Sequence, residues 1–308
     1  MSTQIPPGTI VVGVDGSEHA ERAVRWAARQ AGLEGRALDL LHSVEPVLLR
    51  DTAWLDTQGI DHATLVRALH EASEAALGHA QEVALSEAPD LQVRSHLVER
   101  DARDALIEAS TSAHLVVVGS RGRGPMTTLV LGSVSASVAR HAHGPVVVCR
   151  PHARTPESAC VLVGADGTAA SVPVIEFAFR HASLRGVPLR VLHCFFDAAA
   201  ASRPGLVDAA EVSAYEDLRL LLAESVAGLA EKFPDVAFDL QLGRGLVDEC
   251  LLGQAPAAEL VVVGRTEAHG WARFLSASCA LAVLERASTT VAVVPESAIH
   301  ITRERTPS

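Results

Sequence analysis

The chain repeats itself, and this constrains its fold more than any other feature of the sequence. Residues 11–42 align without a gap on residues 162–193, and the segment LVVVG occurs at 115–119 and again at 260–264. A period of roughly 150 residues is too long for a solenoid unit and is the usual size of one domain. The sequence therefore predicts two tandem copies of the same domain.

The boundary between the copies is expected in the polar stretch PHARTPES, which separates the two aligned blocks. We expect the first domain to span 1–152 and the second to span 158–297, followed by a polar C-terminal tail at 298–308. A chain of 308 residues is long enough for two such domains, each with its own hydrophobic core.

Each half alternates short apolar strands with amphipathic helices. In the first half the pattern predicts strands at 9–15, 37–44, 91–98, 114–119 and 145–149, and helices at 18–32, 61–87, 101–112 and 132–142. The strand LVVVG is apolar throughout, which is typical of a parallel strand covered on both faces. This order predicts a doubly wound α/β fold in each half, with a parallel sheet flanked by helices.

Composition and charge exclude several classes of protein. Hydrophobic residues make up 48% of the chain without any apolar stretch long enough to cross a bilayer, so we expect no membrane segment. The net charge is −11 and neither half carries a basic excess, which disfavours a nucleic-acid partner. The N-terminal MSTQIPPGTI has no features of a secretory signal, and the five cysteines lack C-x-x-C spacing. We therefore expect a cytoplasmic protein with reduced thiols.

Residues suited to binding an anion follow two of the predicted strands. Asp15 comes after the first strand, and the glycine-rich segment GSRGRG at 119–124 comes after the fourth. Ligands of open α/β sheets bind beyond these carboxyl ends, where glycines let the backbone approach closely. The helix that begins at 132–133 adds free amide groups. Arg121 and Arg123 would either add positive charge there or lie solvated in the loop. The sequence predicts a phosphate site here.

Two common nucleotide motifs do not fit these glycines. A P-loop requires lysine and a hydroxyl residue at its end, where the segment 119–126 has Pro125 and Met126. A dinucleotide fingerprint requires G-x-G-x-x-G after the first strand, which Gly13 and Gly16 do not supply. A P-loop NTPase is therefore excluded, and a nicotinamide site is poorly supported.

The pattern that does fit is G-x2-G-x9-G-[S/T], formed by Gly119, Gly122, Gly132 and Ser133. With Asp15 and the duplication, this pattern makes the chain resemble the universal stress protein family, in its tandem-domain form. The resemblance extends over nearly the whole chain. It implies a five-stranded parallel sheet in each domain, the adenine nucleotide alpha hydrolase-like fold, and, in the ATP-binding branch of the family, an adenine nucleotide as ligand.

The resemblance also implies which residues bind ATP. Asp15 and Val14 would contact the adenosine, and Ser43 or Val44 would border the adenine. Val118 and Gly119 would approach the ribose. The phosphates would be held by Gly122, Gly132, Ser133 and Val134. A magnesium ion on the phosphates is compatible with the sequence, which offers no protein cage for a metal. No catalytic residue is assigned.

The second half departs from the pattern. Asp166 and Gly264 are kept, but Glu267 and Ala277 stand where the first half has its second and third motif glycines. A glutamate would repel a triphosphate, and both side chains would narrow the approach to the backbone. We therefore expect the second domain to bind nucleotide weakly or not at all. A rearranged site is the alternative, because Asp166-Gly167-Thr168 is intact.

Two other features recur in both halves. His42 and His193 end the second strand of each half, and since they recur where the phosphate motif does not, we expect a structural role for them. The final strands, at 146–148 and 291–293, are expected at sheet edges. In the family that the chain resembles, such strands pair domains, which implies a pseudo-dimer of the two halves and association of two chains into a homodimer.

These observations lead to one principal hypothesis and two alternatives. The principal hypothesis is a stress-response regulator whose N-terminal domain binds ATP and uses its occupancy as a signal. The first alternative is an enzyme, either a slow ATP hydrolase or one that transfers phosphoryl or nucleotidyl groups. The second is a structural interaction module without nucleotide. The sequence has no recognisable catalytic base, so we assign at most a weak ATPase activity.

Overall fold

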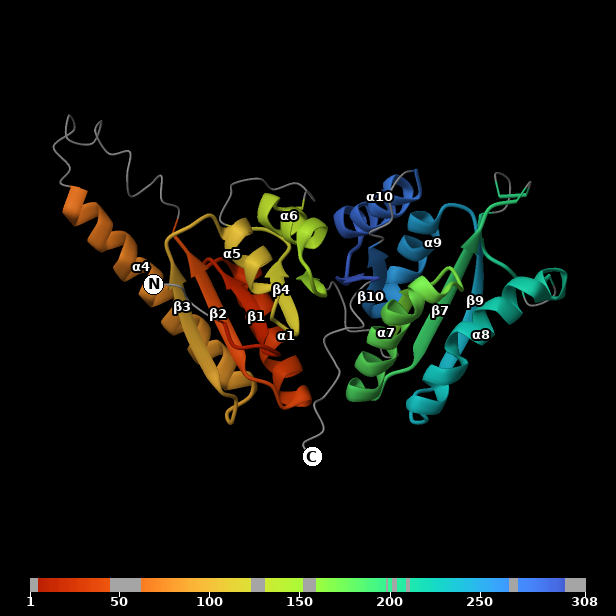
Figure 1. The fold of residues 1–308 in the computed structure, drawn as a ribbon, viewed down its shortest axis with the longest axis horizontal. Coiled ribbons are helices and arrows are strands. Elements are labelled where there is room, and N and C mark those ends of the chain that lie inside the picture. Colours follow the sequence, from red (N-terminus) through yellow and green to blue (C-terminus); the bar gives the residue numbers. More distant parts are fainter. Residues whose placement is uncertain are drawn as a thin grey trace. The chain divides into compact units, whose positions relative to one another are not determined.

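Two compact units, Met1–Cys149 and Arg150–Ser308, make up the chain. In each unit, helices cover both faces of a predominantly parallel sheet (Figure 1). The computed structural model describes the following residues, with the backbone alone at 62 and 271–278: 5–44, 62–122, 131–151, 159–197, 199–200, 204–208, 211–265 and 271–296.

The sheet of the first unit has five parallel strands in the order β3-β2-β1-β4-β5. The strands are β1 (Ile10–Val14), β2 (Leu38–Ser43), β3 (Val93–Val98), β4 (Leu115–Gly119) and β5 (Val146–Cys149). Their succession changes direction between β1 and β4, which are neighbours in the sheet. This is the switch point at which doubly wound folds bind ligands. The five-stranded parallel sheet predicted for this unit is confirmed.

Four helices flank this sheet in the described part of the first unit: α1 (Glu18–Glu34), α4 (His62–Glu87), α5 (Ala102–Ala109) and α6 (Ser133–His141). Helix α1 packs on α4 and α5 packs on α6, one pair on each face of the sheet (Figure 1). The helices lie where the sequence predicts them, except that α5 ends three residues earlier than expected. Among the described residues of the whole chain, no helix has both the length and the hydropathy of a membrane span.

The described part of the second unit repeats this architecture and also contains a short antiparallel strand. Its parallel strands follow the order β11-β10-β6-β7-β9, and a two-residue strand, β8, joins β9 antiparallel. The five parallel strands predicted for this unit are confirmed, and β8 lies outside that prediction. The elements are β6 (Cys160–Gly164), η1 (Ala169–Ser171), α7 (Val172–Arg185), β7 (Leu189–Phe195), β8 (Gly205–Leu206), η2 (Val212–Tyr215), α8 (Glu216–Lys232), β9 (Phe238–Arg244), α9 (Val247–Gln254), η3 (Ala255–Ala257), β10 (Ala258–Arg265), α10 (Trp271–Arg286) and β11 (Thr290–Pro295).

Local sequence signals fix the ends of α1. Ser17 is its N-cap, and the Ser17 Oγ accepts a hydrogen bond of 3.2 Å from the amide of Ala20. Gly35 ends the helix at φ +63°, a left-handed conformation that glycine adopts without steric cost. Between these ends an alanine-rich face is buried against the sheet. The cap, the buried face and the terminal glycine together explain why this segment is helical.

One buried carboxylate lies in the sheet of the first unit. Asp39 on β2 is fully buried, and its side chain pairs with Arg94 at 2.8 Å and with His96 at 2.7 Å, both on the neighbouring strand β3. Burial raises the pKa of the Asp39 carboxyl, but the hydrogen bonds from His96 and Arg94 outweigh this effect and hold the pKa at about 2. The network stabilises the folded form as long as Asp39 is ionised.

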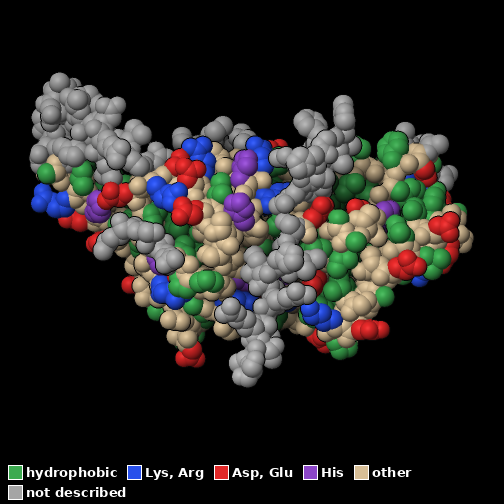
Figure 2. Space-filling view, viewed as in Figure 1, with side chains coloured by type: hydrophobic (Ala, Val, Ile, Leu, Met, Phe, Trp, Pro, Cys, Tyr) green, Lys and Arg blue, Asp and Glu red, His purple; other side chains and the backbone are tan. Residues whose placement is uncertain are grey.

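Surface charges of both signs are interspersed on the face of the molecule that Figure 2 displays. In the first unit, for example, Arg25 pairs with both Glu21 and Glu87, and Arg29 pairs with Glu87. These pairs are formed between exposed or partly exposed side chains. The absence of a nucleic-acid partner remains a prediction from the sequence.

Candidate nucleotide site

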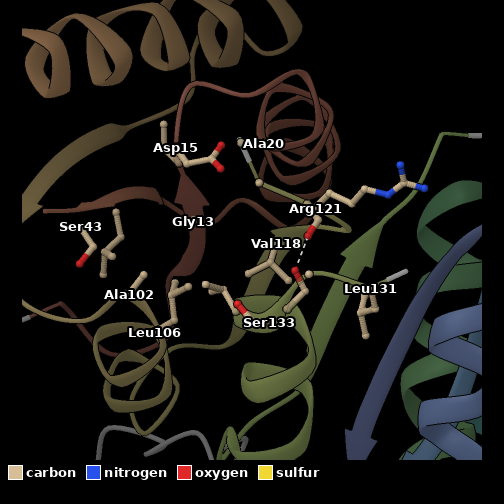
Figure 3. Close-up of a pocket in the computed structure, with 17 residues that line it drawn as sticks. Gly13, Asp15, Ala20, Ser43, Ala102, Leu106, Val118, Arg121, Leu131 and Ser133 are labelled. Carbon is tan, nitrogen blue, oxygen red and sulfur yellow. Dashed lines mark hydrogen bonds between the residues drawn. The ribbon is translucent and has the colours of Figure 1, made fainter. Parts of the chain in front are cut away.

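A cavity of about 540 Å³ opens at the carboxyl ends of β1 and β4, at the switch point of the first sheet. Figure 3 shows its two ends. Ser43, Ala102 and Leu106 lie at one end, Arg121 and Leu131 lie at the other, and Ser133 at the start of α6 lies between them. The first end is formed by β2 and α5 and is largely apolar. The second is formed by the glycine-rich segment after β4 and the start of α6.

Backbone atoms approach each other closely behind β4. A Cβ atom at Gly119 would lie 2.6 Å from the carbonyl oxygen of His19 in α1, which is shorter than real contacts allow. Glycine is therefore required at Gly119 for α1 to pack against the end of β4. The close packing also brings the backbone of this strand end to the cavity without a side chain in the way.

Gly122, the second motif glycine, lies next to the carboxylate of Asp15 in the wall of the cavity. A Cβ atom at Gly122 would lie 2.8 Å from Oδ2 of Asp15. The other oxygen of this carboxylate, Oδ1, accepts a hydrogen bond of 2.9 Å from the amide of Ser17. Asp15 is thus held by the turn that precedes α1, and a side chain in place of Gly122 would have to displace its carboxylate.

Helix α6 points its N-terminus at the cavity. Gly132 is the N-cap residue, its amide donates to the carbonyl of Ser120 at 2.9 Å, and among the described residues no side chain caps the helix. The residues of the first turn, Ser133, Val134 and Ser135, line the cavity. Amide groups at a helix N-terminus carry partial positive charge and bind phosphate. This end of the cavity is therefore built to hold an anion.

Ser43 presents a hydroxyl oxygen at the opposite end. Its hydroxyl group donates a hydrogen bond to the carbonyl of Arg100, in the segment before α5. Because the proton is used in this way, the oxygen is left to act as an acceptor toward the cavity. Leu41, Ala102 and Leu106 surround it with apolar surface.

Charged side chains also lie near the end of the cavity that is suited to an anion. Burial lowers the pKa of His19, and the positive charges of Arg22 and Arg121 lower it further. The ring of His19 hydrogen-bonds Arg22 at 3.1 Å and lies 3.4 Å from the hydroxyl oxygen of Ser120. In Figure 3 the side chain of Arg121 extends away from Asp15 and Ser43. Arg123, also expected to add positive charge, lies outside the described residues.

Nine of the ten residues that the sequence singled out line this one cavity: Val14, Asp15, Ser43, Val118, Gly119, Gly122, Gly132, Ser133 and Val134. Val44 is buried and is not among the lining residues. Their contact with a ligand remains a prediction. Gly13, which the sequence places at the end of the first strand, also lines the cavity. Sequence reasoning missed other lining residues, namely Leu131 before α6 and five residues on strands or helices: Ala20, Leu41, Ala102, Leu106 and Ser135.

The recurring histidines join neighbouring strands, as expected for a structural role. The Nδ1 of His42 donates to the carbonyl of Val14 at 2.7 Å, and the Nδ1 of His193 donates to the carbonyl of Ala165 at 3.0 Å. Each bond ties the end of a unit's second strand to the end of its first. In the first unit it fixes the backbone of a residue that lines the cavity.

The corresponding region of the second unit keeps the turn but changes its surroundings. The carboxylate of Asp166 accepts from both the amide and the hydroxyl of Thr168, at 2.9 and 2.8 Å. A Cβ atom at Gly167 would lie 2.7 Å from the side chain of Leu221, which shows that α8 packs over this turn. Glu267 and the side chain of Ala277, which replace motif glycines, lie outside the described part of the structure.

Comparison with known proteins assigns the family. The sequence matches the universal stress protein family twice, over residues 7–150 and 160–295. It is 37% identical to a universal stress protein of Mycolicibacterium smegmatis, over 92% of this chain and 96% of the relative. It is 36% identical to universal stress protein Rv2623 of Mycobacterium tuberculosis, over 94% and 96%. The chain therefore belongs to the universal stress protein family and contains two tandem copies of its domain.

Solved structures agree with this assignment at the level of the fold. A universal stress protein from Archaeoglobus fulgidus superimposes with a TM-score of 0.69 at 19% identity, over 94% of this chain and 98% of the other. A smaller neighbour, 27% identical over 47% of this chain and 97% of its own length with a TM-score of 0.33, is a universal stress protein solved in complex with cAMP.

Proposed function

We propose that the first unit binds ATP in its cavity and that the chain acts as a nucleotide-dependent regulator of a stress response in the cytoplasm. One observation carries this proposal. The cavity has an apolar end and an anion-binding end, and its volume of about 540 Å³ is within the usual range for small-molecule sites. A nucleotide has the same division into a flat base and a charged phosphate chain.

The phosphates would lie at the start of α6. Gly119, Gly122 and Gly132 keep side chains away from the backbone here, and the amides of the first turn point at the ligand. Among the described residues, no group of three or more His, Cys, Asp or Glu side chains is placed to hold a metal ion. A magnesium ion would accordingly be bound through the phosphates and water.

The base would lie between β2 and α5. Ser43 offers an acceptor oxygen, because its proton is donated to Arg100. The exocyclic amino group of adenine is a donor and can bond this oxygen, whereas the corresponding group of guanine is a carbonyl. This contact favours ATP over GTP. Leu41 and Leu106 would pack against the faces of the ring.

We further propose that the second unit does not bind ATP. Its sequence places Glu267 and Ala277 at motif positions, and Leu221 of α8 packs against the turn at Gly167.

The enzymatic alternative has no comparable support. Asp15 is the one carboxylate among the described lining residues, and a hydrogen bond from Ser17 already fixes it in the turn. The pairing of the two domains and of two chains stays a prediction.

Calorimetric titration of the full-length protein with Mg-ATP, Mg-GTP and cAMP tests the proposal. We expect ATP to bind at least roughly tenfold more tightly than GTP, since a mismatched hydrogen-bonding group in a site costs about 1.4 kcal/mol or more. ATP should also bind more tightly than cAMP, which has a single phosphate for α6. Failure to bind any of the three would overturn the proposal. Sustained ADP release with Mg-ATP would support the enzymatic alternative instead.

A further inference from the structure

Three cysteines of the second unit lie on the elements that correspond to those around the cavity of the first unit. Cys194 follows His193 on β7, as Ser43 follows His42 on β2. Cys250 lies on α9 and Cys279 on α10. All three are free cysteines in the structure; Cys250 is buried, and Cys194 and Cys279 are partly buried. The nucleotide proposal for the first unit gives none of them a role.

Two of these sulfurs meet at a glycine. Cys194 pairs in register with Gly243 on the neighbouring strand β9. A Cβ atom at Gly243 would lie 3.3 Å from Sγ of Cys194 and 3.2 Å from Sγ of Cys250. Each of the two thiols is also the main influence on the pKa of the other. The missing side chain at Gly243 therefore leaves the space in which both sulfurs meet.

The environment makes the two thiols unequal. The hydrogen bond from Cys194 lowers the pKa of Cys250, although burial and the carboxylates of Glu249 and Asp248 oppose this effect. The pKa of Cys194 is raised, because this thiol is hydrogen-bonded to Cys250, is partly desolvated, and would have to ionise beside it. Thiolates are the reactive form of cysteine. Cys250 is therefore the more reactive sulfur, and Cys194 is the partner that lies against it.

We propose that Cys194 and Cys250 form a hydroperoxide-sensitive dithiol that closes into an intramolecular disulfide. The Cys250 thiolate attacks the O–O bond of the hydroperoxide and becomes a sulfenic acid, while the other oxygen leaves as water or alcohol after protonation. The Cys194 sulfur then attacks the sulfenic sulfur, the S–O bond breaks and water leaves. Two thiols are oxidised by two electrons, and the hydroperoxide is reduced. The product links β7 to α9.

Peptide mapping of the full-length protein tests this directly. Trypsin places the cysteines on separate peptides, because cleavage after Arg244, Arg265 and Arg273 isolates Cys250 from the other two. After one equivalent of hydrogen peroxide, we expect two of the five thiols to be lost and the Cys194 and Cys250 peptides to be joined within one chain. Retention of all five thiols, or a disulfide to another cysteine or between chains, would overturn the proposal.

Substitutions at two glycines separate the geometry from general thiol reactivity. Gly243→Ala inserts a methyl group at the point where both sulfurs meet, so we expect disulfide formation to slow by roughly tenfold or more, given the narrow geometry of the bond. Gly253→Ala is the matched control, because a Cβ atom there meets nothing within 4 Å. Equal rates in the two variants would contradict the proposed arrangement.

Trapping identifies the sulfur that is attacked. In Cys194→Ser the sulfenic acid at Cys250 has no partner, so dimedone should label Cys250 after peroxide treatment. In Cys250→Ser the dimedone adduct should be lost, because the attacking sulfur is gone and partial burial still disfavours the Cys194 thiolate. Cys160→Ser is the control and should form the disulfide at the rate of the unsubstituted protein. Labelling of Cys194 alone would contradict the assignment of Cys250 as the attacking sulfur.

Discussion

The two units share a scaffold and differ in what they present at its ligand-binding edge. A Cβ atom at Gly13 would lie 3.2 Å from the side chain of Leu106, and one at Gly164 would lie 3.2 Å from that of Leu251. The turns after the first strands are also alike, with carboxylates that accept from amides two residues ahead. The packing of helix on strand has thus been kept in both copies.

The lining of the corresponding region has not been kept. Where the first unit places Ser43, the second places Cys194, and the glycine that faces Asp15 in the first unit is Glu267 in the second. Exposed large hydrophobic side chains are also unevenly shared among the described residues. The first unit has Leu33, and the second has Phe196, Leu206, Leu220, Leu221, Phe238, Leu246 and Val247. The comparison teaches that a doubly wound scaffold can be retained while its binding chemistry changes.

The largest expected effect on ATP affinity comes from replacing Gly122 of the first unit with glutamate, the residue at the corresponding position of the second unit. Gly122→Glu places a Cβ atom 2.8 Å from Oδ2 of Asp15 and adds a carboxylate beside the phosphate site. We expect ATP binding to weaken by at least about 100-fold, measured by calorimetry, because both crowding and like charge oppose the ligand. Gly78→Glu on the exposed face of α4 adds the same side chain in open space and should bind ATP normally. Equal affinity in the two variants would break the comparison.

Removing the carboxylates of Asp15 and Asp166, which occupy corresponding positions in the two units, distinguishes their effect on stability from their effect on ATP binding. Asp15→Ala and Asp166→Ala each remove an acceptor for the amide two residues later. The two variants should therefore lose similar stability, about 1 kcal/mol each, in thermal melts. Only Asp15→Ala should weaken ATP binding, by roughly 10- to 100-fold, because the charged hydrogen bond expected between the Asp15 carboxylate and the adenosine would be lost. Weakened binding in Asp166→Ala would indicate that the second unit also holds ATP.

The buried pair of Asp39 and Arg94 should make the first unit lose stability in acid, and the second unit has an exposed carboxylate at the corresponding place in its sheet. Asp39 pairs across strands with Arg94, whereas the register of the second sheet places Arg190 beside the exposed Asp239. The folded pKa of Asp39 is about 2 and its ordinary value is 3.8, so its contribution is complete above pH 4 and is lost as pH falls toward 2. The loss should be about 2 kcal/mol in the free energy of unfolding.

Urea unfolding between pH 6 and pH 2 measures this contribution. Asp39→Asn should be less stable than the unsubstituted protein near neutral pH and should lose less stability on acidification. Asp239→Asn is the matched control and should change stability by less than about 0.5 kcal/mol, as expected for an exposed charge. Identical pH profiles for Asp39→Asn and the unsubstituted protein would contradict the buried-pair account.

The smallest effect is expected from the third motif glycine. In Gly132→Ala the new Cβ atom would lie 3.3 Å from Cα of Arg121 and 3.4 Å from the carbonyl oxygen of Ser120, contacts that small shifts can relieve. We expect roughly tenfold weaker ATP binding, since about 1.4 kcal/mol corresponds to a factor of ten. Gly78→Ala is the control on α4. An unchanged affinity would mean that the second unit is inactive because of Glu267 rather than Ala277.

The sequence was most informative where spacing and backbone geometry coincide. The duplication, the strand order and the glycine pattern led to both sheets of parallel strands and to nine residues of one cavity, because these features recur at fixed positions. The short strand β8 was missed because its two residues, Gly205 and Leu206, give no strand pattern in the sequence. The meeting of Cys194, Gly243 and Cys250 was missed because it depends on strand register and helix packing, which cysteine spacing does not encode.

The central claim, that one unit binds nucleotide and the other does not, is tested most directly by stoichiometry. The full-length protein would be saturated with Mg-ATP, freed of excess ligand, denatured, and its released nucleotide quantified by chromatography and mass spectrometry. The account predicts one adenine nucleotide per chain and none from Gly122→Glu. Two per chain, or one that persists in Gly122→Glu, would contradict it.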